Sequence, residues 1–191
     1  MASLHLAGTL IKKLSMHHEQ LLKILYAPME ELGYKNLDKY TWVLPFDEFS
    51  IVSNIVRREE PRFDILMVVV FDLLEKEFPL EKCRQEKLLI ETTLYDLLLS
   101  LGEPEKNLNK LFYNNFYKGA EFELENNIPA IMDLFKTKII PFFENWNDYL
   151  WLIENFEKRI FKKPFYVIGP DVFLNFFYEQ LVFKQWIKEN C

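Results

Sequence analysis

The sequence has little glycine and little cysteine, and these two shortages exclude several classes of protein. The five glycines stand apart from one another: Gly8, Gly33, Gly102, Gly119 and Gly169. A phosphate-binding loop needs clustered glycines so that backbone N–H groups can approach the anion, which excludes a P-loop or a dinucleotide-binding turn. Cys83 and Cys191 form neither a C-x-x-C pair nor a disulfide framework. This usage favours the reducing cytoplasm.

Long apolar runs and an excess of basic charge are also missing. The longest unbroken apolar run, Ile65–Phe71, has seven residues, whereas a membrane span needs about 20. Lys12 and Lys13 follow the first apolar residues instead of preceding them, and no small-residue cleavage site closes that stretch, so no signal peptide is expected. The net charge of −6 argues against a general nucleic-acid binder. We therefore expect neither a membrane nor a nucleic acid as a partner.

Apolar and aromatic residues, in contrast, are abundant. Half of the 191 residues are apolar, and 18 Phe, 9 Tyr and 4 Trp are among them. A chain of this length can bury roughly 70% of its unfolded surface in one core. No internal repeat and no shift in composition marks a second unit, so we predict a single α+β domain over residues 1–191.

Apolar residues spaced by three, four and seven from Leu10 to Leu32 predict a first helix. Pro28 predicts a kink or break near Ala27, and Gly33 is a plausible C-cap.

Three strands are predicted after this helix, at Tyr40–Leu44, Phe49–Val56 and Phe63–Phe71. The segment 57–62 between the last two is charged, contains a proline and predicts a hairpin connection. Sequential strands with short links favour an antiparallel meander. The third strand is apolar on both faces from Ile65 onward, which predicts a central position in the sheet.

Leu80–Leu101 is predicted as a helix that ends at Gly102, although Lys87–Thr93 could instead be a strand. Leu108–Tyr117 is predicted as a short helix. Ala120–Glu125 alternates strictly between acidic and apolar residues, which is typical of a half-buried strand.

Helices are predicted for most of the remaining chain. Asn127 looks like an N-cap with Pro129 just inside the helix start, and this helix should stop or kink at Pro141. Asn147 is expected to begin another, and the last runs over Asp171–Glu189. The whole pattern predicts an α+β fold with an N-terminal helix, a small antiparallel sheet of three to four strands and a helix-rich C-terminal half.

No constellation of residues points to a particular reaction. His17 and His18 are adjacent, so on a helix they point about 100° apart, and no second cluster completes a metal shell. No serine stands in a G-x-S-x-G motif. Cys83 beside Lys82 and Arg84 is more typical of packing than of catalysis. We therefore expect no catalytic residue, no metal and no cofactor.

Acidic residues gather in one part of the chain. Residues 119–157 contain eight acidic residues and two lysines, a surplus equal to the net charge of the whole protein. On the predicted strand, Glu121, Glu123 and Glu125 would share one face about 7 Å apart. This is either a solvated edge strand or a docking surface for a basic protein. In the second case Glu144 and Asp148 extend the candidate partner-binding surface.

The polar residues of the last helix change sides. Asn175 and Glu179 lie close together around the helix axis, whereas Lys184 and Lys188 lie roughly opposite. One buried face cannot satisfy both halves. Either the helix is buried nearly all round, or its aromatic residues reach a homodimer partner or another protein. We therefore add Phe177 and Trp186 to the candidate partner-binding residues.

Three short motifs support a resemblance to a protein family. They are the segment Leu32-Gly33-Tyr34-Lys35 before a Trp-containing strand, Ile139–Glu144, and Trp151-Leu152-Ile153, and Phe122-Glu123-Leu124 is a fourth that adds to them. In this order the chain resembles small bacterial α+β proteins of the polymorphic-toxin immunity type. The resemblance implies a cytoplasmic inhibitor that binds a protein, here a basic one. A non-catalytic subunit of a larger assembly remains the alternative, followed by an enzyme that uses carboxylates such as Glu144 and Asp148.

Overall fold

A computed structural model of the chain describes residues 22–57, 63–71, 89–112, 121–160 and 163–190. Much of the predicted first helix, the predicted hairpin connection, the three histidines and both cysteines lie outside these ranges. Residues 22–31 form a helix. It is followed by β1 (Lys35–Asn36), β2 (Thr41–Pro45), β3 (Phe49–Arg57), β4 (Phe63–Phe71), β5 (Leu89–Thr93), α4 (Leu94–Ser100), α5 (Glu105–Phe112), α6 (Glu121–Leu134), η1 (Phe135–Ile139), α7 (Ile140–Glu144), η2 (Asn145–Asn147), α8 (Tyr149–Asn155), η3 (Phe156–Ile160), β6 (Tyr166–Ile168) and α9 (Pro170–Asn190).

The helix at 22–31 continues through Pro28 without a break and ends at Gly33 as predicted. Gly33 has φ 90°, a left-handed conformation that suits glycine because it has no Cβ. Its N–H donates to Glu30 O at 2.9 Å, and Tyr34 N donates to Met29 O at 3.1 Å. This pair of bonds is the Schellman arrangement, which satisfies carbonyls at a helix end. It turns the chain directly into β1.

The three predicted strands correspond to β2, β3 and β4, and they pair as an antiparallel meander. In the described part of the chain the sheet has six strands in the order β1-β2-β3-β4-β5-β6, not three to four. The additional strands are β1, β5 and β6, which have two, five and three residues. Segments this short leave little periodic pattern in a sequence.

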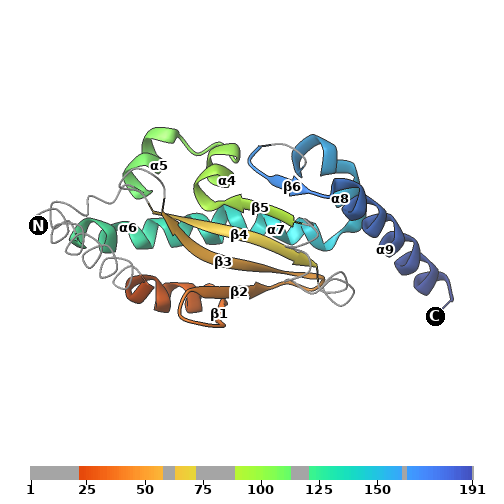
Figure 1. Cartoon of the computed structure of the whole chain (residues 1–191), viewed down its shortest axis with the longest axis horizontal. Coiled ribbons are helices and arrows are strands. Elements are labelled where there is room, and N and C mark those ends of the chain that lie inside the picture. Colours follow the sequence, from red (N-terminus) through yellow and green to blue (C-terminus); the bar gives the residue numbers. More distant parts are fainter. Residues whose placement is uncertain (1–21, 58–62, 72–88, 113–120, 161–162, 191) are drawn as a thin grey trace, which may run out of the picture.

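The sheet carries its main core on one face. Phe49, Ile51, Met67, Val69 and Phe71 are all at most 4% exposed on that face, and α6 and α7 run behind the strands there (Figure 1). The predicted central strand β4 is buried on both faces, since its burial pattern has no exposed position.

The segment before Gly102 contains a strand as well as a helix. Residues 89–93 are β5, paired with β4 in the register Val69↔Ile90, so the helix prediction is wrong there and the strand alternative is correct. Thr93 then caps α4, because its Oγ1 accepts a hydrogen bond from Asp96 N at 3.3 Å. α4 ends at Ser100, and Gly102 follows its C-cap Leu101 with φ 88°.

The predicted strand at Ala120–Glu125 is wrong, because residues 121–134 form α6. Glutamate and leucine are strong helix formers, and six alternating residues are too few to override the stripe of buried residues that follows. That stripe, Ile128, Ile131 and Phe135, has the three- and four-residue spacing of a helix.

Two predicted helix boundaries, at Asn127 and at Pro141, also differ from the structure. Pro129 lies inside α6, and Asn127 is not its N-cap. The Asn127 side chain instead donates to the carbonyls of Lys110 and Leu111 at 3.1 and 3.3 Å, at the end of α5. The helix also passes Pro141 without stopping. The π-helical segment η1 leads into α7, and Ile140 N bonds to Phe135 O five residues back.

The last helix agrees closely with its prediction and packs into an aromatic cluster. The ring of Phe71 on β4 lies 5.1 Å from that of Phe177 and 5.7 Å from that of Phe176. Trp146 lies 6.1 Å from Phe49 on the same side. Aromatic pairs at these separations attract each other beyond the burial of their area. They hold the first half of α9 against the sheet.

Candidate protein-binding surface

The acidic candidates on α6 do not form the common face expected of them. Positions 121, 123 and 125 are helical, and about 100° per residue turns position 123 roughly to the opposite side of the helix from the other two. The prediction that these three residues share one strand face is therefore wrong. The side chains of Glu121, Glu123 and Glu125 lie outside the described part of the structure.

Glu144 and Asp148 are both exposed, but Asp148 also has a structural role. Its Oδ1 accepts hydrogen bonds from Leu150 N at 2.9 Å and from Trp151 N at 3.3 Å. This makes it the N-cap of α8, where a negative charge also favours the helix dipole. Glu144 stands at the end of α7.

The two aromatic candidates on α9 have opposite environments. Phe177 is fully buried, with its ring 5.8 Å from that of Phe156, so its side chain is not available to a partner. Trp186 is 57% exposed. They lie nine residues apart, which is two and a half helical turns, so their side chains point to opposite sides of α9.

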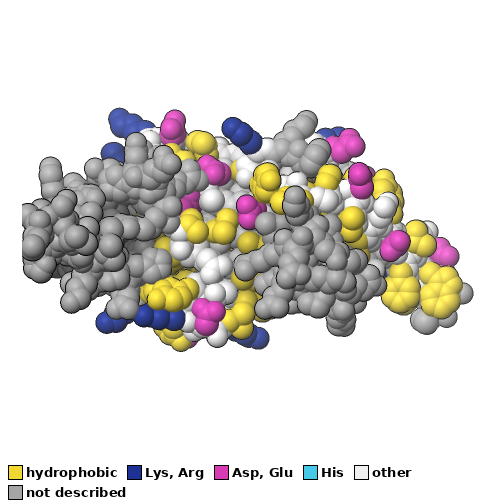
Figure 2. Space-filling model, viewed as in Figure 1, with side chains coloured by type: hydrophobic (Ala, Val, Ile, Leu, Met, Phe, Trp, Pro, Cys, Tyr) yellow, Lys and Arg dark blue, Asp and Glu magenta, His cyan; other side chains and the backbone are white. Residues whose placement is uncertain are grey.

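The half-turn offset holds for Val182 and Trp186. Phe183 and Ile187, seven and eleven residues after Phe176, stay within about 20° of that buried residue around the helix axis. In the first half of α9, Phe173, Phe176 and Phe177 face the core. In the second half the apolar side chains are exposed: Val182 by 65%, Phe183 by 54%, Trp186 by 57% and Ile187 by 38%. We call these four residues the α9 patch. Figure 2 shows hydrophobic side chains gathered at the end of the molecule where α9 projects, with acidic side chains beside them.

Polar contacts fix the orientation of this half of the helix. Lys184 and Lys188 lie on the side that continues from Phe177. Lys184 forms an ion pair with Glu48, in the link between β2 and β3, and its Nζ lies 4.7 Å from the ring centre of Tyr149. Tyr149 in turn donates to Glu48 Oε2 at 3.2 Å. Lys184 thus holds this half of α9 to the body, and Val182 and Trp186 lie on the side of the helix that faces away from it.

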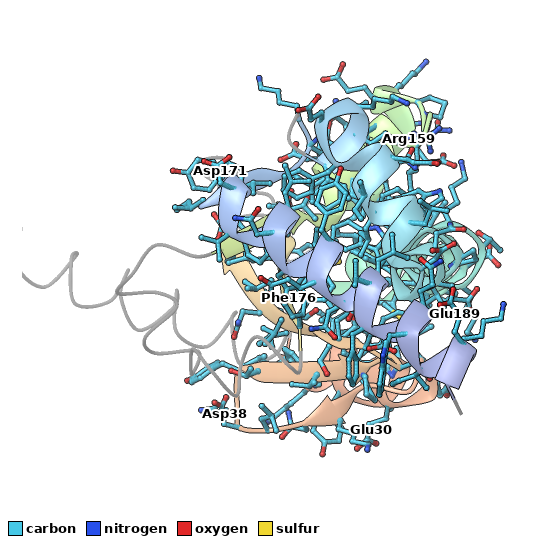
Figure 3. The ribbon with its side chains drawn as sticks, turned by 90° about the vertical axis from the view of Figure 1, so that its right-hand side faces the viewer. Glu30, Asp38, Arg159, Asp171, Phe176 and Glu189 are labelled. Atoms are coloured by element: carbon cyan, nitrogen blue, oxygen red, sulfur yellow. The ribbon has the colours of Figure 1, made fainter. Side chains whose placement is uncertain are left out.

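The charges on the outward side of α9 are all acidic. Asp171, Glu179 and Glu189 are exposed and lie seven or eleven residues from Val182 or Trp186, which places them on the side of the helix that those two residues occupy. Figure 3 looks onto this helix as it crosses the molecule between Asp171 and Glu189. Its two lysines in the same stretch belong to the opposite side.

The α9 patch has the composition of an interface core. It exposes on the order of 400 Å² of apolar surface, taking about 150–250 Å² for a large side chain. Contiguous patches of that size on a single chain are often functional. Interface cores are typically aromatic and depleted in charge, inside a polar rim. Asp171, Glu179 and Glu189 would supply an acidic rim.

The sequence identified only one member of the α9 patch, Trp186. Val182, Phe183 and Ile187 were missed, although their spacing of i, i+1 and i+5 gives one apolar side when read together with Trp186. What could not be read from the sequence was which side of the helix faces the core.

The described residues offer little support for other kinds of site. No three His, Cys, Asp or Glu side chains come together there as metal ligands. None of the helices in the described ranges is long and apolar enough to span a membrane. Comparison of the chain with protein-family models, with curated proteins and with solved structures finds no match.

Proposed function

We propose that this protein acts by binding another protein, and that the outward side of α9 is the contact. The observation that carries the proposal is the exposure of Phe183 and Trp186 on the second half of α9, which Lys184 anchors to the body of the protein. Burying such aromatic side chains is the main source of affinity at interfaces. A helix that presents an apolar side in this way fits a hydrophobic groove on its partner.

The partner is proposed to be basic. Every charge on the outward side of α9 is acidic, so a groove bordered by lysines or arginines would complement it. A second copy of this chain fits less well. In a parallel pair of α9 helices, Glu179 and Glu189 would each meet the same carboxylate of the other copy, and such like charges repel. The proposal keeps the protein partner expected from the sequence, but its main contact is α9 and not the acidic residues of α6.

Within this class, the first proposal is an immunity-type inhibitor that blocks a basic enzyme in the cytoplasm. The α9 patch and its acidic rim support it, because inhibitor complexes use interfaces of roughly 800 Å² per partner and this patch would supply about half. Glu144, Glu154 and Glu157 are also exposed and extend the acidic surface. A non-catalytic subunit of a larger assembly could use the same contact.

The experiment is affinity purification from a lysate of the source cell with matched baits. They are the wild type, Phe183→Ser, Trp186→Ser and, as a control, Leu150→Ser, which removes a side chain 49% exposed on α8. We expect a basic protein on the wild-type and Leu150→Ser baits and its loss from the other two. Equal capture by all four baits contradicts the proposal.

A second assay separates the inhibitor from the assembly subunit. The activity of the captured partner is measured with and without one equivalent of this protein. Inhibition that Phe183→Ser abolishes supports the immunity-type proposal. Full activity in a stable complex supports the subunit.

A further inference from the structure

The second half of α9 lies outside the core. Each residue from 182 to 189 is exposed, and Figure 1 shows this end of the helix projecting beyond the rest of the described fold. In proteins most helical stability comes from packing, and an unsupported helical end frays. Val182, Phe183, Trp186 and Ile187 are β-branched or aromatic and have lower helix propensity than leucine or lysine. A contact with the body is therefore needed if this half is to be ordered before a partner binds.

Such a contact is centred on the carboxylate of Glu48. Its Oε1 forms an ion pair with Lys184 Nζ, and its Oε2 accepts a hydrogen bond from the Tyr149 hydroxyl at 3.2 Å. Lys184 Nζ also lies over the Tyr149 ring, 4.7 Å from its centre. The three side chains form a closed triangle in which each contacts the other two. We call this triangle the Glu48 clamp.

The two residues that hold Lys184 are themselves fixed to the body of the protein. Tyr149 is only 2% exposed. Glu48 stands in the tight link between β2 and β3, which is closed by a hydrogen bond from Phe46 N to Phe49 O at 2.8 Å. Its side chain is 23% exposed, against 43% for that of Lys184. The Glu48 clamp therefore joins a rigid site on the body to a helix end that the core does not hold.

We propose that Glu48 is a positioning residue for the docking helix, because through Lys184 it holds residues 182–189 helical and in place before the partner arrives. The inference rests on the proposed function, and it assigns to Glu48 an effect on a partner that contacts the other side of α9. Order that exists beforehand does not have to be supplied by the binding energy, so the affinity rises without a new contact. Where only a fraction of the molecules is ordered, the apparent affinity falls by that fraction.

The first test is hydrogen exchange of the free full-length chain, measured by mass spectrometry for the wild type and for Glu48→Gln. Glutamine keeps an acceptor for the Tyr149 hydroxyl but removes the negative charge. We expect amides at 182–189 to exchange up to about fivefold faster, the largest factor that a partly exposed ion pair supplies. Amides at 128–134 on α6 should not change, and the melting temperature should stay at the wild-type value because the loosening is local.

Further variants show whether the pair itself is responsible. Lys184→Gln should have the same effect as Glu48→Gln, and the double variant no larger one, because all three remove a single interaction. Lys184→Arg keeps the charge and the pairing and should exchange like the wild type. Glu31→Gln is the matched control, since it removes an exposed carboxylate from the helix at 22–31, and it should change nothing.

The second test measures the affinity for the protein captured by the wild-type bait. Glu48→Gln should weaken binding by the same factor by which exchange rises, whereas Glu31→Gln should not. Unchanged exchange at 182–189, or faster exchange with unchanged affinity, overturns the inference and leaves the proposed function standing. If no bait captures a protein, the proposed function fails and the positioning role falls with it, while the exchange data still show whether the Glu48 clamp orders the helix.

Discussion

Trp186 lies on the opposite side of α9 from Phe177, two and a half turns further along the helix. Phe177 is fully buried in the aromatic cluster, whereas Trp186 is 57% exposed. A surface helix normally keeps one apolar stripe along its length. In α9 Val182 and Trp186 leave that stripe, whereas Phe183 and Ile187 continue the side of Phe176. The first half of the helix is held by the core, and all four of these later side chains are exposed.

The two halves should therefore differ in what they contribute to stability. Phe177→Ala removes a buried ring and is expected to lower the free energy of unfolding by about 3–5 kcal/mol. Phe183→Ala, the matched change on the exposed side, should cost no more than about 0.5 kcal/mol. Urea denaturation followed by circular dichroism measures both values. Similar losses in the two variants would mean that the α9 patch is packed against the core.

Asp148 and Glu144 should also differ in their contribution to stability, although both are exposed acids and lie four residues apart. Asp148→Ala removes the N-cap of α8 and is expected to cost about 1 kcal/mol. Glu144→Ala removes a side chain without such a bond and should be within about 0.5 kcal/mol of the wild type. Thermal denaturation of the two variants at neutral pH checks this. If both variants melt at the wild-type temperature, the capping bonds of Asp148 contribute nothing.

Tyr34 should make the protein sensitive to alkaline pH. Burial raises the pKa of Tyr34 above its ordinary value of 10, against the smaller opposing effect of its hydrogen bond with Ser53. The folded state therefore keeps a proton that the unfolded state releases above pH 10, so stability is unaffected below about pH 9 and falls above 10, by at most about 1.4 kcal/mol per pH unit.

The control for this effect is Tyr34→Phe. This variant loses the hydrogen bond with Ser53, at a cost of about 1 kcal/mol at neutral pH. Its free energy of unfolding should fall less steeply above pH 10 than that of the wild type. Urea denaturation from pH 7 to 11 gives both curves. Parallel curves for the two proteins would show that Tyr34 does not cause the alkaline loss.

Reversing the acidic rim should affect the rate of association more than the fold. Glu179→Lys with Glu189→Lys is expected to leave the melting temperature unchanged and to slow binding of the captured partner several-fold at low salt, because complementary charge acts mainly on encounter. Stopped-flow or surface plasmon resonance measures the rate. Reversal of Glu31 and Glu105, exposed acids on the helix at 22–31 and on α5, is the matched control. An equal effect of both pairs would assign the steering to the net charge.

The meander and the last helix could be predicted because β3, β4 and α9 are long enough to show their period, and β2 contains aromatic and β-branched residues. The errors fall where a local pattern was shorter than the packing that decided it. Residues 121–125 alternate like a strand, but the stripe of Ile128 and Ile131 makes them helical. Residues 89–93 belong to the sheet because β4 offers a partner, which no local pattern contains.

In the candidate site, too, packing decided what the local pattern left open. The change of polar side in α9 was visible in the sequence, but whether Trp186 is buried or exposed depends on where the body of the protein ends. That boundary is set by contacts between Lys184, Glu48 and Tyr149, residues more than 30 positions apart.

The central claim is that the outward side of α9 is the docking surface for a basic protein. Its most direct test is site-specific photo-crosslinking in the source cell, with a photoreactive residue at position 183 and, as a control, at position 150. We predict a crosslinked basic protein from position 183 and none from position 150. Adducts that join two copies of this chain, or the same adducts from both positions, would contradict the claim.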